Sequence, residues 1–148
     1  MKKSYSPEQS LGFQSGLTSR LFNLTLMRRF QGEGIAMSAE QWGTLLVLVR
    51  LGPMTQSTLG ELLLLEKSSI SRLVDGLEKR NWIKRVTPLD DCRKRLISPT
   101  SRATEIVELC TTIAAGVLED ATRNLSPDEL RMYQQIQAKI IGNLKETL

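Results

Sequence analysis

The chain has 148 residues, 41% of them hydrophobic and 24% charged, and these values fit a single globular domain with its own core. It contains no histidine and only two cysteines, so it lacks the commonest general base, the commonest metal ligand and any disulfide scaffold. No nucleophile-elbow or phosphate-loop motif occurs, and no apolar run approaches the roughly 20 residues of a membrane helix. We therefore expect a cytoplasmic protein that is not an enzyme, with no metal or other cofactor, no membrane segment and no signal peptide.

The net charge of +4 is distributed unevenly along the chain. Residues 66–102 hold ten basic and five acidic side chains, a net charge of +5, whereas the rest of the chain sums to −1. Concentrated positive charge is typical of a surface that binds a polyanion, although charge alone equally fits a solvated face. The central quarter of the chain is therefore the first place to look for a nucleic-acid site.

The first third of the chain has the apolar spacing of helices. Apolar residues recur at helical intervals over residues 7–31 and predict one long helix that ends at residues 32–34. Ser38 and Gln41 form a capping box, which opens a second helix expected to end near Arg50. The side chains of this second helix that are expected to point inward are Trp42, Leu45, Leu46 and Val49.

Two shorter helices follow, and the second of them is strongly amphipathic. Thr55 is expected to cap a helix over residues 56–64, and residues 67–80 form the next helix, which ends at Asn81. The residues expected to be buried are Leu59, Leu62 and Leu63 in the first helix, and Ile70, Leu73, Val74 and Leu77 in the second. The opposite face of the second helix presents Ser68, Ser69, Ser71, Arg72, Asp75, Gly76 and Lys79. Such short, polar or basic side chains can approach a phosphate backbone closely.

The periodicity then changes from helix to strand. Residues 82–87 are rich in β-branched and aromatic side chains, and residues 88–91 have the composition of a turn. Residues 96–98 are expected to return as the second strand and to end there, because Pro99 cannot donate to a sheet ladder. This pattern predicts a basic two-stranded hairpin directly after the amphipathic helix.

The succession of two short helices and a basic hairpin resembles the winged helix-turn-helix of the MarR family of transcriptional regulators. The resemblance is carried by the segment 67–80, by residues 82–85, and by the wing signature in which Asp91 and Arg93 flank Cys92. It implies a mainly α fold with a small two-stranded wing (α+β), flanked by N- and C-terminal dimerisation helices. Residues 38–99 would then form the DNA-binding domain, and residues 1–37 and 100–148 the helical dimerisation region.

The C-terminal third is helical again. Residues 100–124 carry a wide apolar stripe, and Ser126 and Glu129 form a second capping box at the start of a last helix. The long helices at both ends of the chain have more apolar surface than a small central core can cover. We expect this surface to pair with a second copy of the chain, and a closed monomeric bundle is the alternative.

The resemblance implies a homodimer that binds double-stranded DNA at a pseudo-palindromic operator. The family further suggests a repressor that a small aromatic or lipophilic effector releases from DNA. Arg72 is expected to read base edges in the major groove, and Arg93 to enter the minor groove. The residues expected to contact DNA are Lys67, Ser68, Ser69, Ser71 and Arg72 in the recognition helix, Thr55 and Gln56 in the helix before it, and Asp91, Arg93, Lys94 and Arg95 in the wing.

Three alternatives stay open at this point. Trp42 and Arg28 could both belong to an effector pocket. Otherwise, Trp42 is an ordinary core residue and Arg28 faces solvent. Cys92, beside three basic residues, fits either a redox sensor or an ordinary wing-surface residue, and Cys110 fits a small apolar helix residue. The winged helix as a whole fits either a DNA-binding or a protein-binding module, and the absence of large apolar residues on the outward face of residues 67–80 favours DNA.

Overall fold

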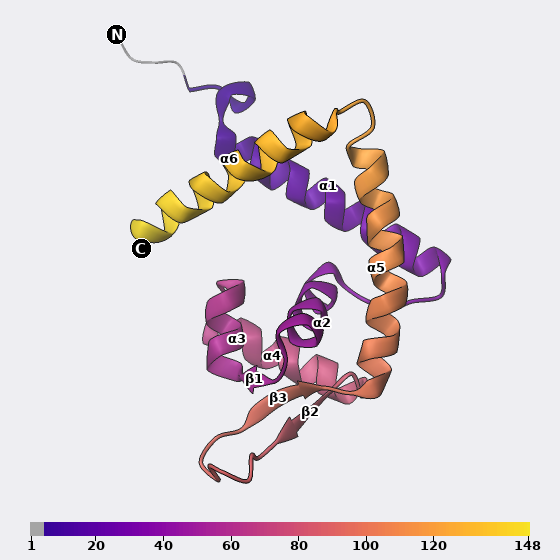
Figure 1. The fold of residues 1–148 in the computed structure, drawn as a ribbon, viewed down its shortest axis with the longest axis vertical. Coiled ribbons are helices and arrows are strands. Elements are labelled where there is room, and N and C mark those ends of the chain that lie inside the picture. The colour runs from indigo at the N-terminus through magenta and orange to yellow at the C-terminus, as the bar shows by residue number, and fades with distance from the viewer. Residues whose placement is uncertain (1–4) are drawn as a thin grey trace. The chain divides into compact units, whose positions relative to one another are not determined.

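The computed structural model describes residues 5–148, so the first four residues of the predicted dimerisation region lie outside it. Backbone contacts divide these residues into two compact units, with the boundary between Ala114 and Ala115. The first unit holds nearly all of the elements and the whole winged helix (Figure 1). The elements in chain order are η1 (Pro7–Gln9), α1 (Leu11–Gly32), α2 (Ala39–Leu51), β1 (Met54–Thr55), α3 (Gln56–Leu63), α4 (Lys67–Lys79), β2 (Ile83–Val86), β3 (Leu96–Pro99), α5 (Ser101–Ala121) and α6 (Pro127–Glu146). Within residues 5–148, no helix is both long enough and apolar enough to cross a membrane.

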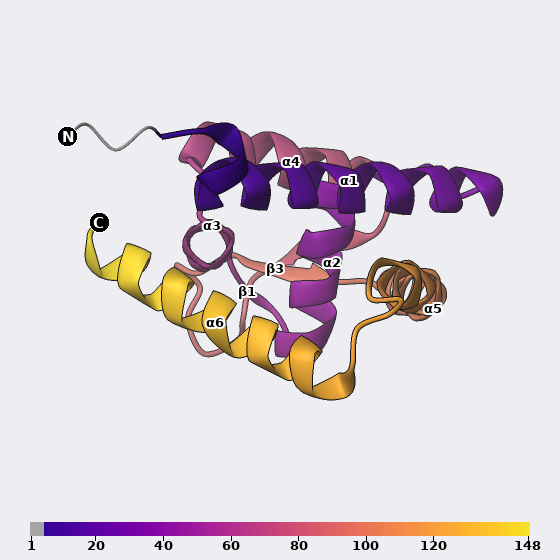
Figure 2. The same cartoon turned by 90° about the horizontal axis from the view of Figure 1, so that it is seen from above.

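The core of the first unit forms where α2, α3 and α4 pack against one another and against the sheet. α4 contacts α2, α3 and β2, and α2 also contacts β3. Figure 2 looks nearly along the axis of α5, and Figure 1 shows β3 below α2 and α3. The side chains that are almost fully buried are Phe30, Leu45, Leu48, Leu59, Val74, Leu77, Ile97, Val107 and Cys110. The fold is therefore mainly helical with a small β-structure, as the sequence predicts.

The predicted two-stranded wing is present as β2 and β3, and the unpredicted strand β1 pairs with β3, which gives an antiparallel sheet in the order β1-β3-β2. The added strand β1 is only two residues long, and Met54 lies opposite Ile97. The strand β3 also includes Pro99, one residue beyond the predicted end. The Thr100 backbone N–H donates to the Trp82 carbonyl at 3.0 Å. In an antiparallel ladder, this bond makes the adjacent Ile83–Pro99 pair one of the pairs that exchange no hydrogen bonds. Proline is tolerated at that position because no donor is needed there.

The first predicted helix is interrupted. Ser10 has an extended backbone, and its side chain accepts a hydrogen bond from the Phe13 backbone N–H at 3.1 Å. It therefore caps α1 at Leu11 and separates this helix from the short η1. The prediction of one continuous helix from residue 7 was wrong because it counted apolar spacing and overlooked this capping serine.

The other helix boundaries agree well with the capping signals. Ser38 and Ser126 each accept from the backbone of the third helical residue, whose own side chain returns a bond to the serine backbone. Thr55 caps α3 by accepting from Thr58, and Asn81 follows α4 in the left-handed conformation with φ of 59°. α5 is shorter than predicted and ends at Ala121.

Burial in α2 and α3 departs from the prediction. Leu62 is 50% exposed and Leu63 is half-buried, and the buried positions of α3, which contacts α4, are Leu59 and Gly60. A Cβ at Gly60 would lie 3.5 Å from a methyl carbon of Ile70, so the two helices are in close contact there. In α2 the buried positions are Trp42, Thr44, Leu45 and Leu48, whereas Leu46 and Val49 are only half-buried.

The second unit consists of the end of α5 and the helix α6. No residue of α6 is buried. Leu130 and Ile140 are half-buried, and the larger apolar side chains that are between 46% and 60% exposed are Met132, Tyr133, Ile136, Ile141 and Leu144.

Candidate nucleic-acid interface

The helices α3 and α4 form a helix-turn-helix, joined by a tight turn at residues 64–66. Leu64 has a left-handed backbone with φ of 53°, and the next amide, of Leu65, returns to the carbonyl of Gly60 at 2.9 Å. This geometry ends α3 abruptly and lets α4 begin at Lys67. No glycine marks the turn, which is why the sequence placed the end of α3 one residue too late.

The outward face of α4 is polar and basic. Ile70, Val74 and Leu77 are buried and fix which face of the helix points to the core. Leu73 and Gly76 are half-buried, as are Ser69 and Ser71 of the predicted outward face. The exposed residues of α4 are Lys67, Ser68, Arg72, Asp75, Glu78 and Lys79. The predicted reading residue Arg72 is therefore on the accessible face.

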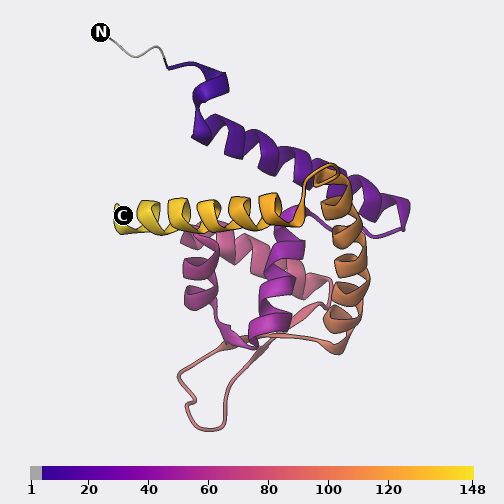
Figure 3. The same cartoon turned by 45° about the horizontal axis from the view of Figure 1, so that its top comes forward.

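The wing consists of β2, β3 and the loop of residues 87–95 between them. It extends away from α2, α3 and α4 in two views (Figures 1 and 3). Asp91 holds the loop in shape, since its carboxylate accepts from the Arg93 backbone N–H at 3.0 Å and lies 3.8 Å from the Arg93 Nε. The Arg93 side chain is 97% exposed, and Lys94 and Arg95 are exposed as well. The wing therefore presents a cluster of accessible positive charge on a turn that Asp91 orders.

The two predicted contacts at the start of α3 have structural partners. Thr55 is the N-cap of α3, and its hydroxyl also lies 3.0 Å from that of Thr58. The amide oxygen of Gln56 accepts a hydrogen bond from Arg85 at 3.1 Å. Arg85 also pairs with Asp75 of α4. The sequence analysis did not single out Arg85, although its place on β2, two residues after the buried Ile83, indicates that it faces the helices.

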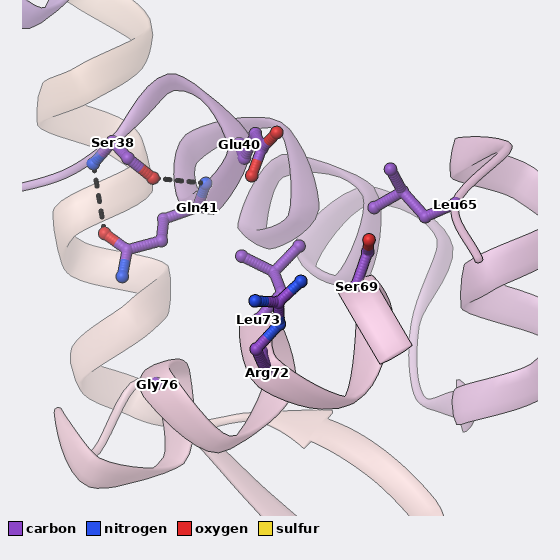
Figure 4. A pocket seen from close by; sticks show the side chains of 8 residues that line it. All are labelled: Ser38, Glu40, Gln41, Leu65, Ser69, Arg72, Leu73 and Gly76. Atoms are coloured by element: carbon purple, nitrogen blue, oxygen red, sulfur yellow. Dashed lines mark hydrogen bonds between the residues drawn. The ribbon is translucent and has the colours of Figure 1, made fainter. Parts of the chain in front are cut away.

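An open pocket of about 450 Å³ lies between the start of α2 and the outward side of α4 (Figure 4). Arg72 and Ser69 border it from α4, opposite the capping box of Ser38 and Gln41. The complete lining is Ser38, Glu40, Gln41, Leu65, Ser69, Arg72, Leu73 and Gly76. Neither Trp42 nor Arg28 belongs to this pocket.

Trp42 and Arg28 are not brought together at a cavity among the described residues. Trp42 is buried, and its ring meets that of Phe30 edge to face at a centroid distance of 6.1 Å. Arg28 is exposed on α1. An effector site that uses these two side chains stays a prediction.

The two cysteines have opposite surroundings. Cys92 is exposed on the wing, whereas Cys110 is buried in α5. Burial raises the pKa of the Cys110 thiol to about 11, which keeps this thiol protonated and unreactive at neutral pH. A redox role for Cys92 stays a prediction.

Comparison with known proteins identifies the fold. Residues 37–94 match the family model described as "MarR family", from the start of α2 into the wing loop. The solved structure of the transcriptional regulator PA3341 superimposes with a TM-score of 0.80 and 29% sequence identity, over 93% of this chain and 99% of that one. The winged helix of this chain, residues 37–94, is therefore similar to that of the MarR family.

Two further proteins are similar to this chain. The HTH-type transcriptional regulator PapX of Escherichia coli is 28% identical over 93 residues. That match covers 63% of this chain and 57% of PapX, so the chain spans a little over half the length of this curated relative. A cysteine-to-serine variant of Escherichia coli MarR, solved in complex with operator DNA, has the same fold at a TM-score of 0.78 and 21% identity, over 88% of this chain and 92% of that one.

Proposed function

We propose that this protein is a transcriptional regulator of the MarR family that binds double-stranded DNA as a homodimer in the cytoplasm, and that it has no catalytic activity. The observation that carries this proposal is the pairing of the polar outward face of α4 with a basic, exposed wing. Arg72 is accessible on the helix, and Arg93 is almost fully exposed on the wing. A helix with this face suits the major groove, and an exposed wing arginine suits the narrow minor groove beside it.

A protein-binding role for the winged helix is less well supported. Protein-binding faces carry exposed large apolar residues, whereas every exposed residue of α4 is polar or charged. The relatives named above are transcriptional regulators, and the MarR variant was solved with operator DNA. These observations support DNA as the partner of α4 and of the wing.

A homodimer is supported by large apolar side chains that stay exposed to solvent in residues 5–148. Phe13, Leu17, Leu21 and Leu24 follow one face of α1 at helical spacing and are between 43% and 55% exposed. α6 exposes a comparable set. A second copy of the chain would cover both surfaces and give two recognition helices, which suit a pseudo-palindromic operator with half-site centres about 10 bp apart.

Repression and its release are the finer part of the proposal. The family resemblance supports a repressor that a small aromatic or lipophilic effector detaches from DNA. The exposed Cys92 on the wing supports oxidation as a second route of release. Operator binding measured with and without peroxide, in the wild type and in Cys92→Ser, separates the two routes. Only the oxidation route requires the Cys92 thiol.

The test of DNA binding is selection of bound duplexes from a random pool, followed by affinity measurement on the enriched sequence. We expect an enriched pseudo-palindrome that binds a protein dimer. Failure to enrich any sequence, together with no binding to duplex DNA at low salt, would refute the proposed function.

The wing is tested by the salt dependence of binding. Each protein cation near the phosphates releases counterions, so Arg93→Ala should reduce the slope of log K against log salt by about one unit per half-site. Glu105→Ala, an exposed change on α5, is the matched control. Unchanged slope and affinity for Arg93→Ala would mean that the wing does not contact DNA.

A further inference from the structure

Arg85 connects the three elements of the proposed DNA interface. Its Nη1 donates to the Gln56 side chain of α3 at 3.1 Å, and its Nη2 lies 2.6 Å from an Asp75 oxygen of α4. Its Nε lies 3.4 Å from a Glu78 oxygen, one turn further along α4. All three nitrogens of one guanidinium are therefore engaged, and the strand that carries them, β2, is part of the wing.

The position of Arg85 on its strand explains this orientation. Side chains alternate between the two faces of a strand, so Arg85 shares a face with the buried Ile83, while Lys84 points to the other side and is exposed. Only 23% of the Arg85 side chain is exposed. Most of this arginine is thus directed toward α3 and α4 and away from solvent.

A planar guanidinium suits this place better than an ammonium group would. It presents several N–H donors in a fixed fork, whereas lysine concentrates its charge in one atom that cannot meet three separated partners. The Asp75 and Glu78 side chains are 55% and 44% exposed, so each ion pair alone contributes little, and the arrangement depends on one guanidinium meeting three partners at once. The contacts join β2 to residues 10 and 29 positions away in the chain.

We propose that Arg85 is a positioning residue, which fixes the wing relative to the recognition helix α4 so that both reach their DNA grooves at once. The consequence for DNA recognition rests on the function proposed above. Without Arg85, the wing would stay folded as a hairpin but would sample several orientations. Arg93 would then contribute less to binding, because its placement would cost conformational entropy when the complex forms.

The first experiment measures the position of the wing without DNA. A thiol-reactive spin label at the exposed Cys92 is combined with a second label at a Lys79→Cys substitution on α4, and Cys110 stays unlabelled because it is buried. The labelled chain is mixed with an excess of unlabelled Cys92→Ser chain, so that distances within one chain dominate. We then expect one narrow distance distribution for the otherwise wild-type chain and a broadened or shifted one for Arg85→Met. Lys84→Met removes the same charge from the other face of β2 and should leave the distribution unchanged.

The second experiment measures the coupling of Arg85 to the wing arginine on the selected operator. In the wild type we expect Arg93→Ala to weaken binding about tenfold or more. In the Arg85→Met background we expect the same change to weaken binding by less than about threefold, since coupled residues have non-additive effects. A residue that merely stabilises the fold would leave the Arg93→Ala effect unchanged.

Two further variants keep the proposal testable if Arg85→Met does not fold, as judged by circular dichroism. Arg85→Lys keeps the charge and should restore only part of the narrow distance distribution. The pair Asp75→Asn and Glu78→Gln removes the α4 carboxylates and should broaden the distribution while Arg85 is intact. An unchanged distribution in these folded variants, or an undiminished Arg93→Ala effect, would overturn the positioning role. If the wild type binds no DNA, the proposed function fails, and the label distances still decide whether Arg85 fixes the wing.

Discussion

The winged helix and the terminal helices have apolar residues at similar spacing, but these residues are buried in the first region and largely exposed in the second. In α4, Ile70, Val74 and Leu77 are all buried against neighbouring helices and the sheet. In the first half of α1, Leu17 and Leu21 stand on an equally regular face but are 43% and 55% exposed. Helical periodicity therefore shows that a face needs a partner, but it does not show whether that partner lies in the same chain.

The helix α1 contains both situations within one element. Near its C-terminal end, Leu26 and Phe30 are buried, and Phe30 packs against Trp42 of α2. Further toward its N-terminus, the larger apolar side chains are exposed. One end of α1 is thus part of the first unit's core, and the other is available for a second copy.

The largest effect is expected from the buried end of α1. Phe30→Ala should lower the free energy of unfolding by about 3–5 kcal/mol, because it removes a fully buried ring and leaves a cavity beside Trp42. Leu21→Ala is the matched change at the exposed end. It should cost less than about 1 kcal/mol at protein concentrations low enough to exclude dimers. Chemical denaturation measures the free energy of unfolding of both variants. Equal losses of this free energy at low protein concentration would show that the two ends of α1 contribute equally to the stability of the monomer.

The next effect concerns association. Leu17→Glu together with Leu21→Glu should raise the dissociation constant of the dimer by about 100-fold or more, since charges would be buried in an apolar interface. Light scattering should then report the 16.6 kDa monomer, with the circular dichroism spectrum unchanged. A Thr18→Glu variant adds a charge to the same helix at an exposed polar position and is the control. If the double variant stays dimeric, this face of α1 is not the interface.

A smaller effect is expected for Arg72 on the winged helix. Arg72→Ala should cost about 1–3 kcal/mol of operator binding per half-site and should broaden the set of selected sequences. Lys79→Ala, also exposed on α4, is expected to weaken all sequences alike. Binding measured on the operator and on single-base variants separates these outcomes. Uniform weakening by Arg72→Ala would make this side chain a phosphate contact and not a base contact.

The smallest effect compares the two capping boxes. Ser38→Ala and Ser126→Ala should each lower the free energy of unfolding by about 1 kcal/mol, because each removes the side-chain acceptor of a backbone N–H at a helix N-terminus. Ser38→Asp and Ser126→Asp keep an acceptor and are the controls. In thermal unfolding, the loss of stability caused by Ser38→Ala should be the same at all protein concentrations. If dimerisation stabilises α6, the loss for Ser126 should diminish as the concentration rises, and a constant loss would argue that α6 is stable without a partner.

The errors of the sequence prediction have physical causes that differ from one place to another. Ser10 was overlooked although its cap is a local feature that the sequence contains. The strand β1 was overlooked because two residues carry no periodicity, and only their pairing with Leu96 and Ile97 of β3 makes them a strand. Leu62 was assigned to the core because leucine favours burial, whereas the close packing of Ile70 at Gly60 centres the buried face of α3 on Leu59 and Gly60 and leaves Leu62 at its edge.

The sequence by itself determined the features that depend on near neighbours. Helix caps at Ser38, Thr55 and Ser126, the amphipathic face of α4, and the Asp91 contact in the wing loop all link residues a few positions apart, so local composition specifies them. Tertiary structure alone decided which apolar faces are covered and which partners Arg85 has. Its contacts with Gln56 and Asp75 exist only after β2 has paired with β3 and α4 has packed on α3, because chain folding brings those distant donors and acceptors within hydrogen-bond distance.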